Sequence, residues 1–177
     1  MDFSKIDDIF SREIIRGGEA YLDGMLRVAT SADQRASSLA GIFIAAATAL
    51  LAAVIALSNP AWAVGSKLAL ILGGGSAALM FLAGAVMCLR TIMPVEFWLP
   101  GCEPENWESD VVAGNKLHDC FGERADHIQS QIVANRTVIE ANALKFKWGA
   151  VFGIAAPFVG LLVWALASAC RLSAAWL

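Results

Sequence analysis

The stretch LAGIFIAAATALLAAVIAL, Leu39–Leu57, has no charged side chain and decides the fold of this chain. Two more apolar stretches follow it, Lys67–Leu89 and Trp148–Ala169. A helix rises about 1.5 Å per residue, so roughly 20 apolar residues cross a hydrocarbon core of about 30 Å. All three stretches reach that length. The sequence therefore predicts an all-α integral membrane protein with three transmembrane helices.

The charges indicate how the chain would lie in the bilayer. Of its residues 58% are hydrophobic and only 16% are charged. Every Lys and Arg except Lys67 and Arg171 lies in Met1–Arg35 or Arg90–Lys147. Because Lys and Arg mark cytoplasmic segments, we expect a cytoplasmic N-terminus, an outer turn at Asn59–Trp62 and a C-terminus outside. The polar start of the chain does not resemble a signal peptide.

The breaks in the pattern divide the chain. Gly17-Gly18 predicts a break after a short amphipathic helix, and no helix-breaking residue stands between Glu19 and the end of the first span. Three prolines and a glycine prevent a continuous helix after the second span. We therefore expect N-terminal cytoplasmic helices (1–38), a transmembrane hairpin (39–93, spans 39–57 and 67–89), an acidic Pro/Trp loop (94–114), a cytoplasmic helix (115–147), a third transmembrane helix (148–169) and a short tail (170–177).

A heptad pattern marks the predicted cytoplasmic helix. Its members alternate four and three apart, and after Gly122 no Pro or Gly interrupts them as far as Gly149; they are Phe121, Ala125, Ile128, Ile132, Asn135, Ile139, Asn142 and Phe146. We expect this helix to run on into the third span and to pack against residues 19–38 in a cytoplasmic bundle. The two asparagines either fix register and oligomeric state or face a small polar ligand.

Small residues follow one face of the first span at every fourth position. Such residues let helix backbones approach closely in lipid. They predict helix packing, within one subunit or between subunits of a homo-oligomer. The residues are Ser37, Gly41, Ala45, Ala49 and Ala53, with Gly149 and Gly153 in the third span.

Several functional classes fit the sequence poorly. The predicted spans between Leu39 and Leu57, Leu68 and Leu89, and Trp148 and Cys170 contain no ionisable Asp, Glu, Lys, Arg or His, which disfavours a monomeric transporter. No catalytic motif is present, so we expect neither an enzyme nor a cofactor. The four cysteines show no metal or disulfide spacing, and a net charge of −3 disfavours nucleic-acid binding.

Three segments resemble a known family. They are Leu26–Leu39, which runs straight into the first span, Arg90–Pro94 after the second, and Ile128–Glu140 before the third. Together they resemble the small membrane effectors of bacterial Pycsar antiphage systems, and Arg35 stands where that family usually has Lys. The resemblance covers most of the chain from about Glu19, through short motifs.

The resemblance implies a bacterial inner-membrane effector of antiviral defence. Such a protein stays quiet until a partner cyclase makes a cyclic nucleotide during infection, and then disrupts the membrane. If a cyclic mononucleotide binds directly, Arg and Asn suit its phosphate and base, and Trp suits stacking. The candidate ligand residues are Arg27, Arg35 and Arg136 for phosphate, Asn135 for a base or ribose edge, and Trp98 or Trp107 for stacking. The arginines also suit topology anchors or solvated helix charges, and the tryptophans suit interfacial or core positions.

Two other functions remain open from the residues alone. The acidic, Trp-bearing segment Pro94–Asp110 suits a membrane scaffold or accessory subunit that binds a protein partner. A constitutive pore-former of holin type is the third alternative, and the large polar portion of the chain argues against it.

Overall fold

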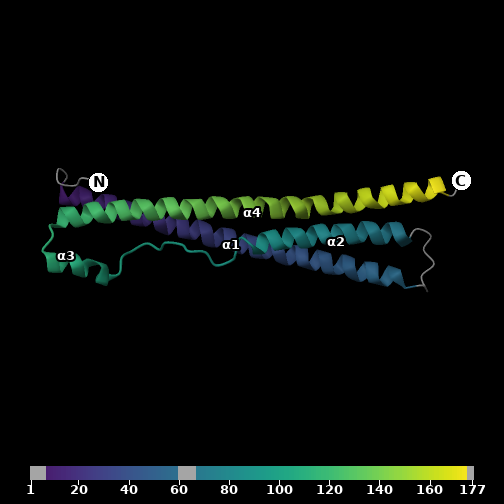
Figure 1. The fold of residues 1–177 in the computed structure, drawn as a ribbon, viewed down its shortest axis with the longest axis horizontal. Helices are drawn as coiled ribbons and strands as arrows, with labels where there is room; N and C mark the ends of the chain where they lie inside the picture. Colours follow the sequence, from purple (N-terminus) through teal and green to yellow (C-terminus); the bar gives the residue numbers. More distant parts are fainter. Residues whose placement is uncertain (1–6, 60–66, 175–177) are drawn as a thin grey trace. The chain divides into compact units, whose positions relative to one another are not determined.

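The computed structural model describes residues 7–59 and 67–174, and their regular structure is helical throughout. The elements are α1 (Asp8–Ser58), α2 (Lys67–Leu89), the 3-10 helix η1 (Pro104–Trp107), α3 (Glu108–Ala113) and α4 (Leu117–Ala174) (Figure 1). Three of them, α1, α2 and α4, are long and apolar enough to cross a membrane. This confirms the all-α prediction with three candidate spans. Most of the predicted outer turn, with Trp62, and the terminal Trp176 lie outside the described residues.

The chain divides into two compact units. Unit 1 contains Met1–Ala32 and Pro94–Ala141, and unit 2 contains Asp33–Met93 and Asn142–Leu177. Helices α1 and α4 contribute to both units, whereas α2 belongs to unit 2 and α3 to unit 1. The long continuous helices predicted from Glu19 and from Asn115 are therefore present.

The core of unit 1 joins the N-terminal part of α1 to α4. Leu22 and Met25 of α1 pack against Ile128 and Ile132 of α4, and all four are buried. Burial of large aliphatic side chains drives this kind of contact in water. The first five heptad positions of the sequence lie on this face and are buried or half-buried. The predicted pairing of residues 19–38 with the 115–147 helix is thus present in unit 1 for the parts around Leu22 and Ile128, and its place in a cytoplasmic bundle stays a prediction.

The predicted helix break at Gly17-Gly18 is wrong, because α1 runs through both glycines. Gly18 serves close packing instead. A Cβ atom placed on it would lie 2.7 Å from Cγ2 of Ile128, whereas one on Gly17 would meet nothing within 4 Å. Two glycines in a helix lower its intrinsic stability, and here tertiary packing outweighs that cost.

Residues 94–116 form the irregular part of unit 1, as the prolines predicted. Residues 95–99 have no regular structure, and η1 and α3 follow them (Figure 1). Gly101 has φ of 101° and Gly114 has φ of 68°, a backbone conformation that side-chain-bearing residues rarely adopt. Gly114 ends α3, and the amide of Asn115 then bonds the carbonyl of Asp110 at 3.0 Å.

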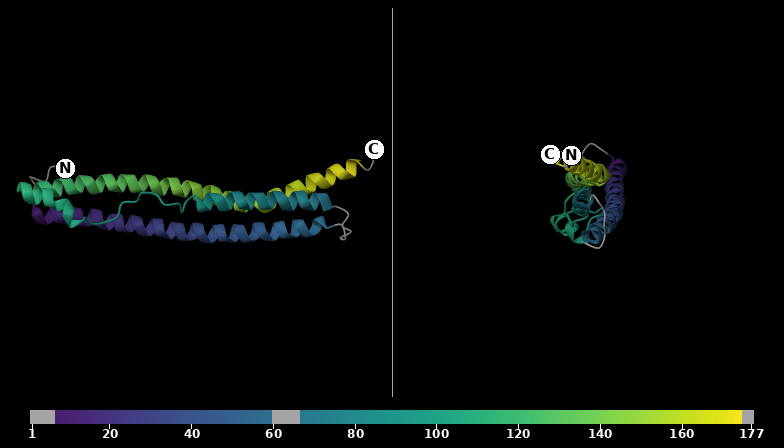
Figure 2. Two further views of the ribbon diagram at one scale, coloured as in Figure 1. Left: turned by 60° about the horizontal axis from the view of Figure 1, so that its bottom comes forward. Right: turned by 90° about the vertical axis from the view of Figure 1, so that its right-hand side faces the viewer.

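Unit 2 packs through small residues. Segments of α1, α2 and α4 lie side by side there in the views of Figure 2. A Cβ on Gly73 of α2 would lie 2.8 Å from the carbonyl oxygen of Gly160, and one on Gly84 would lie 2.9 Å from that of Gly149. Gly153 is equally confined by the ring of Phe43. The predicted packing role of Gly149 and Gly153 therefore corresponds to close contacts in this unit.

The small-residue face of α1 lies elsewhere. Packing of α1 within unit 2 uses Ala36, Ala40, Phe43 and Ala47, which are all buried. The predicted stripe occupies an exposed face of the helix: Ser37, Gly41, Ala45, Ala49 and Ala53. Its role in a homo-oligomer stays a prediction.

Candidate functional site

Unit 1 contains an open polar pocket of about 370 Å³. One wall comes from the segment that carries η1 and α3, and the other comes from the first turns of α4. Its lining combines two carboxylates, a guanidinium, an imidazole, an indole, an amide and two thiols. The lining residues are Cys102, Asn106, Trp107, Asp110, Cys120, Glu123, Arg124 and His127.

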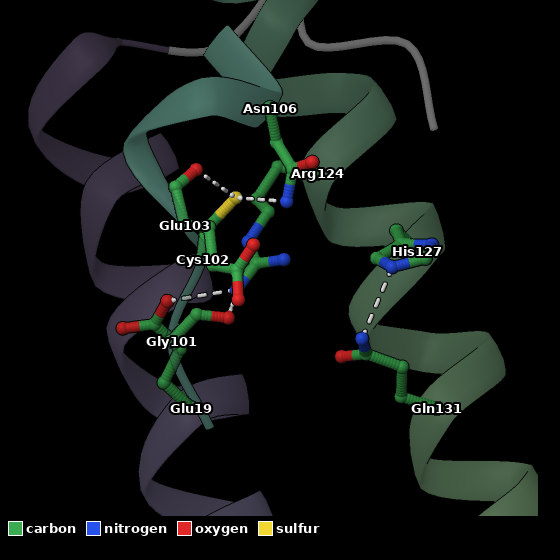
Figure 3. A network of polar contacts seen from close by, with 8 residues as sticks. All are labelled: Glu19, Gly101, Cys102, Glu103, Asn106, Arg124, His127 and Gln131. Carbon is green, nitrogen blue, oxygen red and sulfur yellow. Dashed lines mark hydrogen bonds and ion pairs between the residues drawn. The ribbon is translucent and has the colours of Figure 1, made fainter. Parts of the chain in front are cut away.

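Arg124 joins the walls of this pocket (Figure 3). Only 8% of the residue is exposed. Its Nη2 lies 3.2 Å from Oε1 of Glu19 on α1 and donates a second, short hydrogen bond to the carbonyl oxygen of Gly101. A buried guanidinium needs both a counter-ion and hydrogen-bond acceptors, and these two partners supply them. Arg124 thus holds the loop against α1 and α4 within unit 1.

His127 links the pocket to a buried amide. The amide nitrogen Nε2 of Gln131 can only donate, so it donates to Nε2 of His127 at 3.0 Å (Figure 3). Gln131 is buried, and among the described residues its Oε1 has no hydrogen-bond partner. The ring of Trp98 meets the ring of His127 edge-on, with centroids 6.1 Å apart. A buried amide next to the pocket residue His127 is therefore incompletely satisfied.

The field in the pocket is negative. Burial raises the pKa of the Cys120 thiol above its ordinary value of 9.0, and the carboxylates of Asp110, Glu123 and Asp119 raise it further. Each carboxylate disfavours the thiolate because like charges repel. Cys120 is therefore a protonated, weakly reactive thiol at neutral pH.

Asn135 has a structural role next to the pocket. It is completely buried. Its Oδ1 accepts a hydrogen bond from the amide of Trp98, and its Nδ2 donates one to the carbonyl oxygen of the same residue, each at 2.9 Å. One side chain thus satisfies both backbone groups of a residue in an irregular segment. The other seam asparagine, Asn142, accepts a hydrogen bond from Lys145 in unit 2.

The predicted phosphate ligands do not converge on one place. Arg27 is exposed and pairs with Asp23 at 2.9 Å. Arg136 is exposed on α4 of unit 1, next to Asn135 in sequence, whereas Arg35 is exposed and belongs to unit 2. Of the predicted stacking residues, Trp107 lines the pocket and Trp98 is 40% exposed.

Sequence reasoning identified neither Arg124 nor His127 as a pocket residue. A signal for Arg124 existed: it directly precedes the seam residue Ala125, so it flanks a helix–helix contact where a charge needs a partner. Its partners Glu19 and Gly101 are 105 and 23 residues away in sequence, and no local pattern identifies them. Among the described residues no group of three metal-ligating side chains comes together.

Unit 2 contains an apolar groove of about 620 Å³. Its walls come from α1, α2 and α4 and include Leu50, Phe81, Pro157 and Trp164. No ionisable side chain lines it, so it does not suit a charged ligand. The polar pocket of unit 1 is therefore the better candidate for recognition of a polar molecule.

Comparison with known proteins gives no assignment: no family model, no curated protein and no solved structure matches this chain.

Proposed function

We propose that this protein is a membrane effector of bacterial antiviral defence. A cyclic mononucleotide made by a partner cyclase would activate it, and it would then disrupt the inner membrane, as a multi-pass homo-oligomer with its N-terminus in the cytoplasm. The resemblance of Leu26–Leu39, Arg90–Pro94 and Ile128–Glu140 to Pycsar membrane effectors motivates the identity of the signal.

The main support for the proposal is that two helices, α1 and α4, each contribute to both units. Helix α1 contributes to unit 1 up to Ala32 and to unit 2 from Asp33, and α4 changes unit after Ala141. Unit 1 has a polar pocket, and unit 2 contains the most apolar parts of the three candidate spans. A ligand that prefers one packing of unit 1 would act on the same helices that form unit 2.

The nucleotide itself is best assigned to exposed residues of unit 1. Arg136 offers a solvent-accessible guanidinium for phosphate, and Trp98 offers an indole that is 40% exposed. Asn135 is left out of this assignment because both ends of its amide are bonded to Trp98. Its replacement would disturb the loop whether or not a nucleotide binds.

Dye release from liposomes tests the proposal. The purified protein is inserted into liposomes of bacterial lipids, and cyclic mononucleotides and cyclic oligonucleotides are added one at a time. We expect one cyclic mononucleotide to trigger release, and Arg136→Gln to abolish the response. Arg16→Gln is the matched control, because Arg16 is also an exposed arginine of unit 1, with an ion pair to Glu13 at 3.7 Å.

Two results would contradict this function. The first is no dye release with any nucleotide, from protein shown to be inserted and helical, which would contradict a nucleotide-gated effector. Release without any nucleotide would instead indicate a constitutive pore of holin type.

A membrane scaffold is the second candidate, and exposed apolar side chains on α3 favour it. Val111 is 77% exposed and Val112 is 81% exposed, in a segment that also carries Glu103, Glu105 and Glu108. Adjacent exposed apolar residues rimmed by charge are typical of protein-binding surfaces. A scaffold predicts that one partner co-purifies with the wild type and is lost from a Val111→Ser, Val112→Ser variant, with no nucleotide-dependent dye release.

A further inference from the structure

The charge of the unit 1 pocket is unbalanced toward the negative. The single arginine of its lining, Arg124, is already matched by Glu19 at 3.2 Å. Asp110 and Glu123 also line the pocket, and within the described residues neither of them makes an ion pair. Two carboxylates therefore face the pocket without a bonded cation. A phosphate group would be repelled there, and a cation would be attracted.

Free hydrogen-bond acceptors, one in the pocket and one next to its lining residue His127, also favour a donor. Asp110 uses Oδ1 to accept a bond from Asn115 at 2.8 Å, which fixes the carboxylate and leaves Oδ2 as a further acceptor. The buried Oε1 of Gln131, held next to His127, has no partner among the described residues. In Figure 3 this oxygen points away from the α4 backbone. Buried acceptors of this kind are normally satisfied by a donor group or by water.

An aromatic side chain adds a second attraction for positive charge. Trp107 lines the pocket and is half-buried, so its ring is held in place while part of it stays accessible. Indole faces attract ammonium and guanidinium groups, and the attraction grows when the cation is desolvated. A volume of about 370 Å³ suits a small molecule or a single long side chain.

We propose that this pocket binds an organic cation, with an ammonium or guanidinium group held by Asp110 and Glu123 and packed on the ring of Trp107. The same chemistry has two sources: a free amine of polyamine type, or a lysine or arginine side chain of a protein partner. This inference goes beyond the proposed function and does not rest on it, because Asp110 and Glu123 have no part in the nucleotide assignment.

Binding of spermidine tests the proposal directly. The full-length protein in nanodiscs of zwitterionic lipid is titrated with spermidine at low salt, and tryptophan fluorescence and calorimetry follow binding. We expect one site per chain, weakened at least tenfold by Asp110→Asn and by Glu123→Gln. Glu105→Gln is the matched control, since Glu105 is an exposed carboxylate of the same segment and does not line the pocket. Circular dichroism checks that each variant stays helical.

A second arm distinguishes the sources. A short lysine-containing peptide is titrated in the same way, with its lysine-acetylated form as control. Tighter binding of the peptide than of spermidine, with the same dependence on Asp110, would assign the pocket to a partner's side chain. Tighter binding of spermidine would assign it to a free amine.

Three outcomes would overturn the proposal. They are no binding of spermidine or of the peptide, binding that Glu105→Gln weakens as much as Asp110→Asn does, and binding of a cyclic nucleotide that Asp110→Asn strengthens. The last outcome would place an anion in the pocket. If cations do not bind but a nucleotide still triggers dye release, only this inference is wrong and the proposed function is unaffected. If cations bind but no nucleotide triggers release, only the proposed function is wrong.

Discussion

Units 1 and 2 pack their helices in different ways. In unit 1 the contact between α1 and α4 uses large side chains, Leu22 and Met25 against Ile128 and Ile132, with a partly buried ion pair at its edge. In unit 2 glycine backbones meet, as at Gly73 with Gly160.

The difference follows from the solvent that each unit suits. Burial of Leu and Ile is favourable when the alternative is water, but gains little when the alternative is lipid. In lipid, close backbone approach and dispersion contacts hold helices together, and small residues permit both. Unit 2 accordingly exposes large apolar side chains, such as Ile42, Leu79, Ile154 and Phe158. The two packing modes are those expected if unit 2 lies in a membrane and unit 1 in water, as the proposed function requires.

The largest effect is expected where a glycine of unit 2 meets the backbone of another helix. Gly73→Ala places a Cβ 2.8 Å from the carbonyl oxygen of Gly160 and 2.9 Å from Cβ of Trp164, so α2 and α4 must separate. We expect a loss of about 3 kcal/mol in the free energy of unfolding, the upper part of the range for overpacking. Denaturation in mixed micelles, followed by circular dichroism, measures it.

Gly75→Ala is the control for this variant. A Cβ on Gly75 meets nothing within 4 Å, so only the gain in helix propensity remains, about 0.5–1 kcal/mol in favour of the folded state. Equal stability of the two variants would show that glycine contacts do not hold unit 2 together.

The next effect concerns the polar contacts of unit 1. Asn135→Ala removes the two hydrogen bonds to Trp98 and leaves the backbone amide and carbonyl of Trp98 unpaired. We expect the free energy of unfolding to fall by about 2 kcal/mol and hydrogen exchange at residues 95–101 to become faster. Asn142→Ala is the control, because Asn142 is half-buried and, among the described residues, its side chain is bonded only to that of Lys145. Matching exchange rates in the two variants would contradict the structural role of Asn135.

A smaller effect is expected at the apolar contact of unit 1. Gly18→Ala brings a Cβ within 2.7 Å of Cγ2 of Ile128, a side-chain atom that can shift more easily than a carbonyl of the backbone. We expect Gly18→Ala to lower the free energy of unfolding by about 1 kcal/mol. Gly17→Ala should raise it slightly, because a Cβ on Gly17 meets nothing within 4 Å. Thermal unfolding of the pair distinguishes them, and a stabilised Gly18→Ala variant would show that α1 and α4 do not approach here.

The smallest effect is a pH dependence at Cys120. The pKa of this thiol is raised above its ordinary value of 9.0, so the folded state keeps the proton that the unfolded chain loses first. The resulting stabilisation is complete below about pH 9 and is lost as the pH rises through the folded pKa. Alkylation of Cys120 should be slow at pH 8 and faster in Asp110→Asn, because that change removes a neighbouring negative charge. An unchanged alkylation rate in Asp110→Asn would show that the charge of Asp110 does not affect the Cys120 thiol.

The sequence was sufficient for the long helices because their signals are local. Apolar length predicted the candidate spans, and heptad spacing predicted the face of α4 that carries Ile128 and Ile132. The prediction of a break at Gly17-Gly18 was wrong because a glycine pair looks the same in the sequence of a turn as in that of a close helix contact. Only the position of Ile128, 110 residues later, distinguishes the two.

The pocket was much harder to predict. Trp107 was expected to be functional from its chemistry, but the role of Arg124 depends on Glu19 and on the left-handed Gly101, which no spacing rule connects. The stripe from Ser37 to Ala53 was predicted correctly as a continuous helix face. Its exposure depends on which face of α1 meets α2 and α4, and that choice follows from the whole unit.

The topology of the chain tests the account most directly. Cys102 lies in unit 1 and Cys170 lies beyond the third predicted span, in unit 2. Two variants retain one of these cysteines each, with the other cysteines replaced by serine, and are labelled in spheroplasts with a membrane-impermeant maleimide. With three crossings and a cytoplasmic N-terminus, Cys170 is labelled in intact spheroplasts and Cys102 only after permeabilisation. Labelling of both before permeabilisation would contradict the membrane location of unit 2 and the cytoplasmic location of unit 1.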